Sequence, residues 1–247
     1  MEKTHPLKVT LRTETDVLAS KYIAGVYMQM MAGILLTALV AYGLVMSGLM
    51  EQIAVTGGRG VSMGILILQF GTIMMFRPIM ERASPIAMQG LFFFYAAITG
   101  VTLGYVGLAY TLTSILNVFG AASFAFGGLA IFGYVTNRNL GVVGTFCLQA
   151  LWMSFGMSLL YLAGSFFPAF APYMPALNMM TGLVGVVVFS GLTAYESQTL
   201  KQSAYSLAQG RTDERTAAVY TTWGALTMYL NFMNLFFSLL RLFGRRR

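Results

Sequence analysis

The sequence predicts an all-α, polytopic membrane protein with seven transmembrane helices, the last of which is central. Of its 247 residues, 57% are hydrophobic and only 9% are charged, against about 25% charged residues in soluble domains. The apolar residues form seven long runs, each close to the ~20 residues that a helix needs to cross a bilayer. The last run alone carries a regular line of polar residues, which favours a position inside the bundle.

The elements follow in order from the apolar runs and the breaks between them. Residues 1–21 are expected to be a polar cytoplasmic tail, with a short surface helix as the alternative, residues 22–244 the bundle, and residues 245–247 a basic C-terminal tail. The first run is too long for the apolar core of a cleaved signal and is expected to stay as the first helix. The expected spans are 22–47, 61–80, 86–110, 113–135, 140–167, 176–195 and 221–244.

Three segments are expected to connect these spans as turns or loops. The TGGRG segment at 56–60 lacks the Lys-Ser/Thr of a phosphate-binding loop and is expected to be a turn. Prolines and aromatic residues at 166–175 are typical of a loop at the membrane interface. The polar segment 197–215 is expected to be a loop between the last two spans.

Small residues recur at spacings that allow helix backbones to approach closely. They predict contact faces rather than chemistry: Gly100, Gly104 and Gly107 in the third span; Ser123 and Gly127 in the fourth; Gly182 and Gly185 in the sixth.

The polar line in the last span consists of Thr227, Asn231, Asn234, Ser238 and Arg241. Steps of three and four residues place all five along one stripe of a helix. Amides that face lipid leave hydrogen bonds unmade, which costs a few kcal/mol. The stripe is therefore expected to face protein or water and to be the place of function.

Basic residues set the expected orientation. They gather in the tail and in the loops after even-numbered spans, which predicts a cytoplasmic N-terminus. The arginines at 245–247 then fall on the opposite side, against this rule. Either the last segment crosses fully, which we favour, or it dips in and returns.

Several function classes are disfavoured by composition. The net charge of +7 reflects basic loops beside apolar spans rather than nucleic-acid binding. A single cysteine, Cys147, excludes an intrachain disulfide, and a single histidine, His5, cannot supply a metal cluster. No span contains a histidine or lysine base, so an enzyme is not expected, and neither is a bound cofactor.

One acid stands out, because Glu196 ends the sixth span in unbroken apolar sequence. An acid inside a membrane protein is a functional candidate. Arg82 and Lys201 lie on the same predicted side and are possible partners. A solvated, unpaired Glu196 at the interface is an equally open interpretation.

Two segments, TAYESQTLK (193–201) and MYLNFMNLFFSLLRLFG (228–244), resemble the C-terminal signature of the Bax inhibitor family in its compact bacterial form. This resemblance implies six helices around a central seventh and a calcium leak gated by protons at a pair of acids. Carried over by position, Glu196 is the first acid and Asn231 stands where the second belongs. Arg82 matches the arginine that latches the first acid.

The resemblance therefore predicts a pH-modulated calcium leak with a weakened proton-sensing pair, Glu196 and Asn231, along the cation path. One carboxylate attracts a hard dication less than two do. Calcium is the expected permeant ion, and the lipid bilayer and other membrane proteins are the expected partners. The alternative is a non-conducting membrane regulator of protein quality control or cell death. A bacterial inner membrane is the expected location, with the endoplasmic reticulum as the alternative. From the predicted span ends, Asn231 lies some 15 Å deeper than Glu196.

Overall fold

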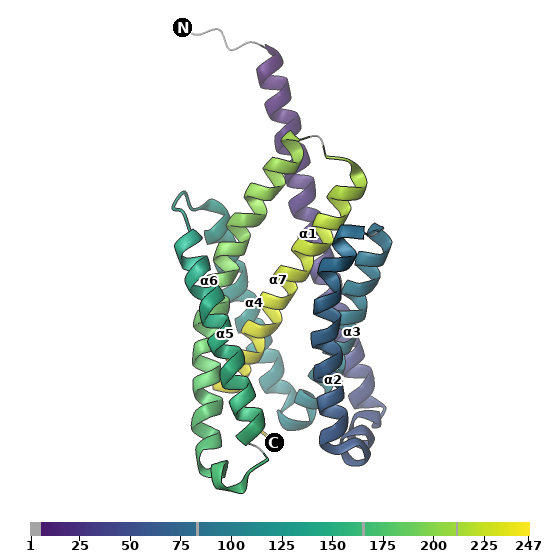
Figure 1. The fold of residues 1–247 in the computed structure, drawn as a ribbon, viewed down its shortest axis with the longest axis vertical. Helices are drawn as coiled ribbons and strands as arrows, with labels where there is room; N and C mark the ends of the chain where they lie inside the picture. The colour runs from purple at the N-terminus through teal and green to yellow at the C-terminus, as the bar shows by residue number, and fades with distance from the viewer. Residues whose placement is uncertain (1–5, 83, 165, 211) are drawn as a thin grey trace. The chain divides into compact units, whose positions relative to one another are not determined.

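A computed structural model describes the backbone of residues 6–82, 84–164, 166–210 and 212–247, and side chains within these ranges except at 6–13, 58, 59, 82 and 168. Seven α-helices and one short 3-10 helix follow one another (Figure 1). Their bounds are α1 Pro6–Met46, α2 Leu49–Arg82, α3 Pro85–Ala109, α4 Leu112–Val135, α5 Gly141–Gly164, η1 Pro168–Tyr173, α6 Met174–Gln209 and α7 Glu214–Phe243.

All seven α-helices are long and apolar enough to cross a membrane, which confirms the all-α, seven-helix fold class. The apolar window of α7 is the most buried of the seven, with 56% of its residues buried, against 39% in α3 and α6. Large apolar side chains on the other helices, such as Phe124 and Trp152, are exposed and suited to contact with lipid. Burial of α7 agrees with its expected central role.

Two segments that were expected to be a turn and a loop are helical instead, and the N-terminal segment is continuous with the first span rather than a tail or a separate short helix. Helix α1 begins at Pro6, α2 runs through residues 56–60, and α6 continues to Gln209, so that only residues 210–213 separate it from α7. At 36 residues, α6 is about 54 Å long, well beyond the ~30 Å of a hydrocarbon core. Hydropathy marks where a helix leaves the lipid, not where it ends, and this explains the error.

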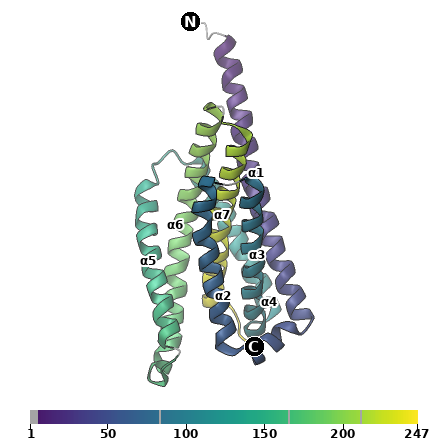
Figure 2. The ribbon, with the colours of Figure 1, turned by 45° about the vertical axis from the view of Figure 1, so that its right-hand side comes forward.

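The chain divides into two compact units, and α6 and α7 contribute to both. The first unit comprises residues 1–108 and 199–229, so it contains α1, α2 and α3 together with the end of α6 and the start of α7. Within it, α2 and α3 lie side by side in both views (Figures 1 and 2). Its core gathers around Tyr229, whose ring meets Phe92 and Tyr95 edge-on, with centroids 5.6 and 6.1 Å away. The Tyr229 hydroxyl shares a 2.6 Å hydrogen bond with Thr37 Oγ1.

Glycines bring α3 close to α1 and α2, as predicted. A Cβ on Gly100 would stand 2.8 Å from the carbonyl oxygen of Thr37, and a Cβ on Gly104 would stand 2.8 Å from Met50 Sδ. The predicted contact face on α4 is wrong, because Ser123 is exposed and Gly127 has open space around its Cα. Spacing alone does not distinguish a packed small residue from one that faces lipid.

Helix α7 starts with a side-chain cap. Asp213 Oδ2 accepts a 3.1 Å hydrogen bond from the backbone N–H of Thr216, and such a cap satisfies an amide that has no partner within the helix. Hydrogen bonds from the side chain and the backbone of Thr216 lower the pKa of Asp213. From this cap, α7 is unbroken to Phe243, so the structure favours a full crossing over a segment that dips in and returns.

The second unit comprises residues 109–198 and 230–247 and contains α4, α5, most of α6 and the end of α7. Helices α5 and α6 lie side by side in both views (Figures 1 and 2). Gly191 on α6 lies directly against the sulfur of Cys147 on α5, whose side chain is only 3% exposed. Phe119 and Phe126 of α4 meet Phe232 of α7 edge-on, each with centroids 5.5 Å apart.

Residues 244–247, which include the predicted basic tail, are held against the connection between α3 and α4. The backbone N–H of Thr111 donates to the carbonyl of Arg245, and that of Arg247 donates to the carbonyl of Ala109, each at 3.1 Å. Tyr110 and Arg246 form an antiparallel bridge, and the guanidinium of Arg246 lies 5.8 Å from the centre of the Tyr110 ring. We call this segment the C-terminal strap.

Candidate functional site

Most polar side chains in the stripe of α7 make hydrogen bonds to the backbone of their own helix. Thr227 Oγ1 donates to the carbonyl of Trp223 at 3.1 Å, Asn234 Nδ2 to that of Leu230 at 2.8 Å, and Ser238 Oγ to that of Asn234 at 2.7 Å. Side chains of this kind commonly bond to the carbonyl four residues earlier. These three side chains therefore find an acceptor on their own helix, and the stripe turns into the protein at Asn231 and Ser238, which are buried. Arg241, at the end of the stripe, is exposed.

Asn231 is the exception in the stripe. Its side chain is only 5% exposed, and its Nδ2 is buried with no hydrogen-bond partner among the described residues. The amide nitrogen therefore makes no hydrogen bond to Glu196. A buried polar group left unpaired costs about 1–3 kcal/mol, and such a group calls for an explanation, often a functional one.

Helices α6 and α7 pack against each other with a clear register in the second unit. A Cβ on Gly182 would stand 3.3 Å from Arg241 Cβ, and Gly185 lies directly against Ser238. Residue numbers increase along α6 as those of the contacting residues decrease along α7, so the two helices are antiparallel here. The predicted contact face of Gly182 and Gly185 is thus present.

This register places Glu196 and Asn231 on facing sides of α6 and α7. Glu196 follows Gly185 by about three full helical turns, and Asn231 precedes Ser238 by about two, so each points within ~20° of a residue at the contact. Along the helix axes the two residues then differ in height by roughly 6 Å. The 15 Å difference expected from the sequence was too large, because both helices extend beyond the predicted spans.

Contacts with α4 and α5 fix the backbone of α6 around Glu196, which is half-buried. The Ala194 carbonyl lies directly against Gly133 of α4, and the Tyr195 ring would stand 2.5 Å from a Cβ on Gly144 of α5. Both glycines are places where any side chain would push the helices apart. They therefore hold α6 in position over the two residues that precede Glu196.

Gln198 is a positioning residue that the sequence analysis missed. It is 9% exposed, and its carboxamide binds the turn between α4 and α5. Its Nε2 donates to the carbonyl of Arg138 at 2.8 Å and to that of Thr136 at 3.4 Å, while its Oε1 accepts from the Leu140 N–H at 3.0 Å. In the sequence Gln198 lies at the start of the polar segment 197–215, where nothing sets it apart from its neighbours.

The remaining predicted site residue, Arg82, is the last residue of α2, and its side chain lies outside the described residues. Within the described part of the chain, no group of three or more His, Cys, Asp or Glu side chains could hold a metal ion. The arrangement offers one carboxylate that can exchange a proton. About one helical turn away along the helix axes lies an amide whose oxygen can accept a hydrogen bond or coordinate a cation.

Comparison with known proteins identifies relatives along nearly the whole chain. A family model described as "Inhibitor of apoptosis-promoting Bax1" matches residues 19–247. The inner membrane protein YbhL of Escherichia coli K12 is 34% identical over 226 residues, which cover 92% of each chain. An uncharacterized protein of Borreliella burgdorferi is 30% identical over 241 residues, which cover 98% of this chain and 99% of its own. The fold, the register of the last two helices and these matches together show that the chain belongs to the Bax inhibitor family.

Proposed function

We propose that this protein is a pH-modulated cation leak, with calcium as the permeant ion and Glu196 as the group that senses protons. The observation that carries the proposal is the placement of Glu196: a half-buried acid on the face of α6 that packs against α7, about one turn from the unpaired amide of Asn231. Acids at such positions in membrane proteins mark ion and proton paths.

In this mechanism the charge on Glu196 controls the path. Its carboxylate attracts a cation, and the Oδ1 of Asn231 offers a second oxygen ligand. Protonation of Glu196 removes this attraction. Two adjacent carboxylates would titrate as a coupled pair, whereas Asn231 leaves a single site. The proposed activity is transport and involves no chemical turnover.

Calcium efflux from liposomes that contain the purified full chain tests this proposal. Efflux is measured across a pH series for wild type, Glu196→Gln, Asn231→Asp and the control Glu51→Gln, which removes an exposed acid at the start of α2. We expect efflux of the Glu196→Gln protein to lose its pH dependence. In the Asn231→Asp protein the pH dependence of efflux should be steeper than in wild type, and the control should match wild type.

Wild-type liposomes that release calcium independently of pH would contradict the role of Glu196. A pH profile that is identical in wild type and Glu196→Gln would do the same. A steeper profile in Asn231→Asp with no effect of Glu196→Gln would place the proton sensor elsewhere on α7.

A non-conducting membrane regulator is the second candidate. It is favoured by the amide at Asn231, which leaves the site with one acid, and by the lack of a larger acidic cluster among the described residues. A regulator of this kind would give no calcium efflux at any pH. Glu196→Gln would then leave the cellular phenotype of the protein unchanged.

We also propose a bacterial inner membrane as the location, with a cytoplasmic N-terminus. The name of the E. coli relative supports the location, and the basic residues in the N-terminal tail and in the even-numbered connections support the orientation. An alkaline phosphatase reporter, which is active only outside the cytoplasm, tests it. The reporter should be active after residue 247 and inactive when placed between α6 and α7; the reverse pattern would invert the topology.

A further inference from the structure

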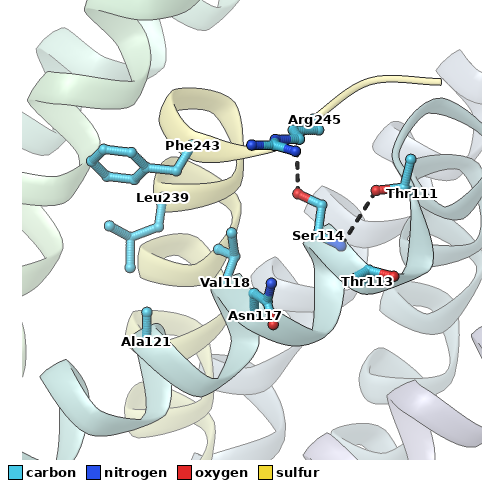
Figure 3. A pocket seen from close by; sticks show the side chains of 9 residues that line it. All are labelled: Thr111, Thr113, Ser114, Asn117, Val118, Ala121, Leu239, Phe243 and Arg245. Carbon is cyan, nitrogen blue, oxygen red and sulfur yellow. Dashed lines mark hydrogen bonds between the residues drawn. The ribbon is translucent and has the colours of Figure 1, made fainter.

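A half-open cavity of about 740 Å³ lies beside the C-terminal strap, entirely within the second unit. Its nine lining residues come from the start of α4, the end of α7 and the strap (Figure 3). They are Thr111, Thr113, Ser114, Asn117, Val118, Ala121, Leu239, Phe243 and Arg245. The volume is in the usual range for small-molecule sites, about 300–1,000 Å³.

Hydrogen bonds of the strap build the polar end of the cavity. Ser114 Oγ accepts a 2.9 Å hydrogen bond from the backbone N–H of Arg245, and Thr111 Oγ1 accepts one of 3.3 Å from the Ser114 N–H (Figure 3). The carbonyl of Arg245 in turn accepts from the Thr111 N–H. This ring of bonds fixes the backbone of Arg245 at the rim and leaves its side chain exposed there.

The lining changes character along the cavity. Arg245 is the only charged residue among the nine, and Thr113 and Asn117, on α4, are exposed donors. Further along α4 and α7 the lining becomes apolar, with Val118, Ala121 and Leu239. Ala121 lies nine residues into the span of α4, roughly 13 Å from its end. The cavity therefore starts at the membrane interface with a positive rim and continues beside the hydrocarbon region.

We propose that this cavity binds an anionic phospholipid. The lipid phosphate pairs with the guanidinium of Arg245, which forms charge-assisted and often bidentate bonds to phosphate. The exposed donors Thr113 and Asn117 on the same lining hydrogen-bond polar groups of the lipid, and an acyl chain lies along the apolar part. A metal cation does not fit this site, because its only charge is positive. A small soluble anion would leave the apolar half unused.

Native mass spectrometry of the purified full chain in detergent tests the proposal with phosphatidylglycerol, and with phosphatidylcholine as the neutral headgroup. Three variants accompany wild type. Arg245→Gln removes the rim charge, Ala121→Phe fills the apolar end without changing charge, and Arg246→Gln is the matched control. Arg246 belongs to the same strap, but its guanidinium lies over Tyr110 and not in the cavity.

We expect wild type to bind phosphatidylglycerol more tightly than phosphatidylcholine. Arg245→Gln should weaken phosphatidylglycerol binding about tenfold, the size of one charge-assisted bond, and should abolish the headgroup preference. Ala121→Phe should weaken both lipids, while Arg246→Gln binds as wild type does. Glycerol phosphate, the soluble headgroup, should not displace the lipid.

Three results would overturn the proposal. Equal binding of the two lipids would show that the headgroup is not recognised. Equal effects of Arg245→Gln and Arg246→Gln would show that only the total positive charge of the strap matters. Displacement by glycerol phosphate, together with wild-type binding in Ala121→Phe, would identify a site for soluble anions. Thermal unfolding of each variant shows whether a loss of binding comes from a loss of folding.

Discussion

Replacement of Gln198 by alanine tests how α6 is held next to Glu196. The change removes all three hydrogen bonds of the carboxamide, including the good ones at 2.8 and 3.0 Å to the turn between α4 and α5. The Leu140 N–H loses its acceptor where the bond is buried. One lost bond, from Nε2 to the Arg138 carbonyl, at about 1 kcal/mol and one stranded buried donor at about 1–3 kcal/mol give an estimate of about 2–4 kcal/mol.

Thermal unfolding of the purified chain in detergent measures this loss. For a chain of this size the expected fall in Tm is on the order of 5–15 °C. Gln202→Ala is the matched control, because Gln202 lies one turn further along α6 and is exposed. Gln198→Glu keeps an acceptor for the Leu140 N–H but turns a negative charge toward two carbonyls, so it should destabilise at least as much.

The assigned role for Gln198 would be wrong if Gln198→Ala and Gln202→Ala unfolded at the same temperature. It would also be wrong if Gln198→Glu were as stable as wild type, since the bonds that Nε2 donates would then contribute nothing.

Three further predictions concern stability in the same detergent assay. Gly133→Ala should destabilise by about 1–3 kcal/mol, because its Cβ meets a backbone carbonyl of α6, whereas Gly127→Ala, with open space, should gain up to about 1 kcal/mol; equal shifts would contradict the packing. Tyr229→Phe should cost about 1 kcal/mol, and a double-mutant cycle with Thr37→Val should show coupling, whereas strict additivity would argue against their hydrogen bond. Asp213→Ala should lower Tm at pH 7. Because the pKa of Asp213 is lowered in the folded state, its stabilising effect is present above the ordinary aspartate pKa, about 3.9, and is lost as the pH falls through the lowered value. The difference from wild type should therefore shrink in acid, and an unchanged difference would assign the effect to something other than the carboxylate.

The number of spans could be predicted from the sequence, but not the lengths of the helices. Apolar runs identify lipid-crossing segments because burial in hydrocarbon requires them. The continuation of α6 through residues 197–209 depends on contacts with other helices. Gly224 of α7, for example, would place a Cβ 3.1 Å from Val26 of α1 and 3.5 Å from Leu200 of α6. Contacts between segments so far apart in sequence leave no periodic signal.

The candidate site was predicted in part. Glu196 could be found because an acid in apolar sequence is rare, and its place on the α7-facing side of α6 agrees with that interpretation. The positions of the α7 stripe were assigned correctly, but hydropathy treats a threonine or asparagine as unsatisfied even where its own helix supplies the acceptor. Gln198 was missed because its partners lie about sixty residues away in the chain, and a single sequence does not reveal such pairs.

The packing of Cys147 against Gly191 has a practical consequence for labelling experiments on this protein. It is the only cysteine in the chain, and its thiol is shielded by α6. We therefore expect maleimide reagents not to label it in the folded protein. Single cysteines can then be introduced at chosen surface positions without first replacing the native one, a change that would open a void between α5 and α6. A fluorophore or spin label placed at residue 117 would report directly on what enters and leaves the space beside it.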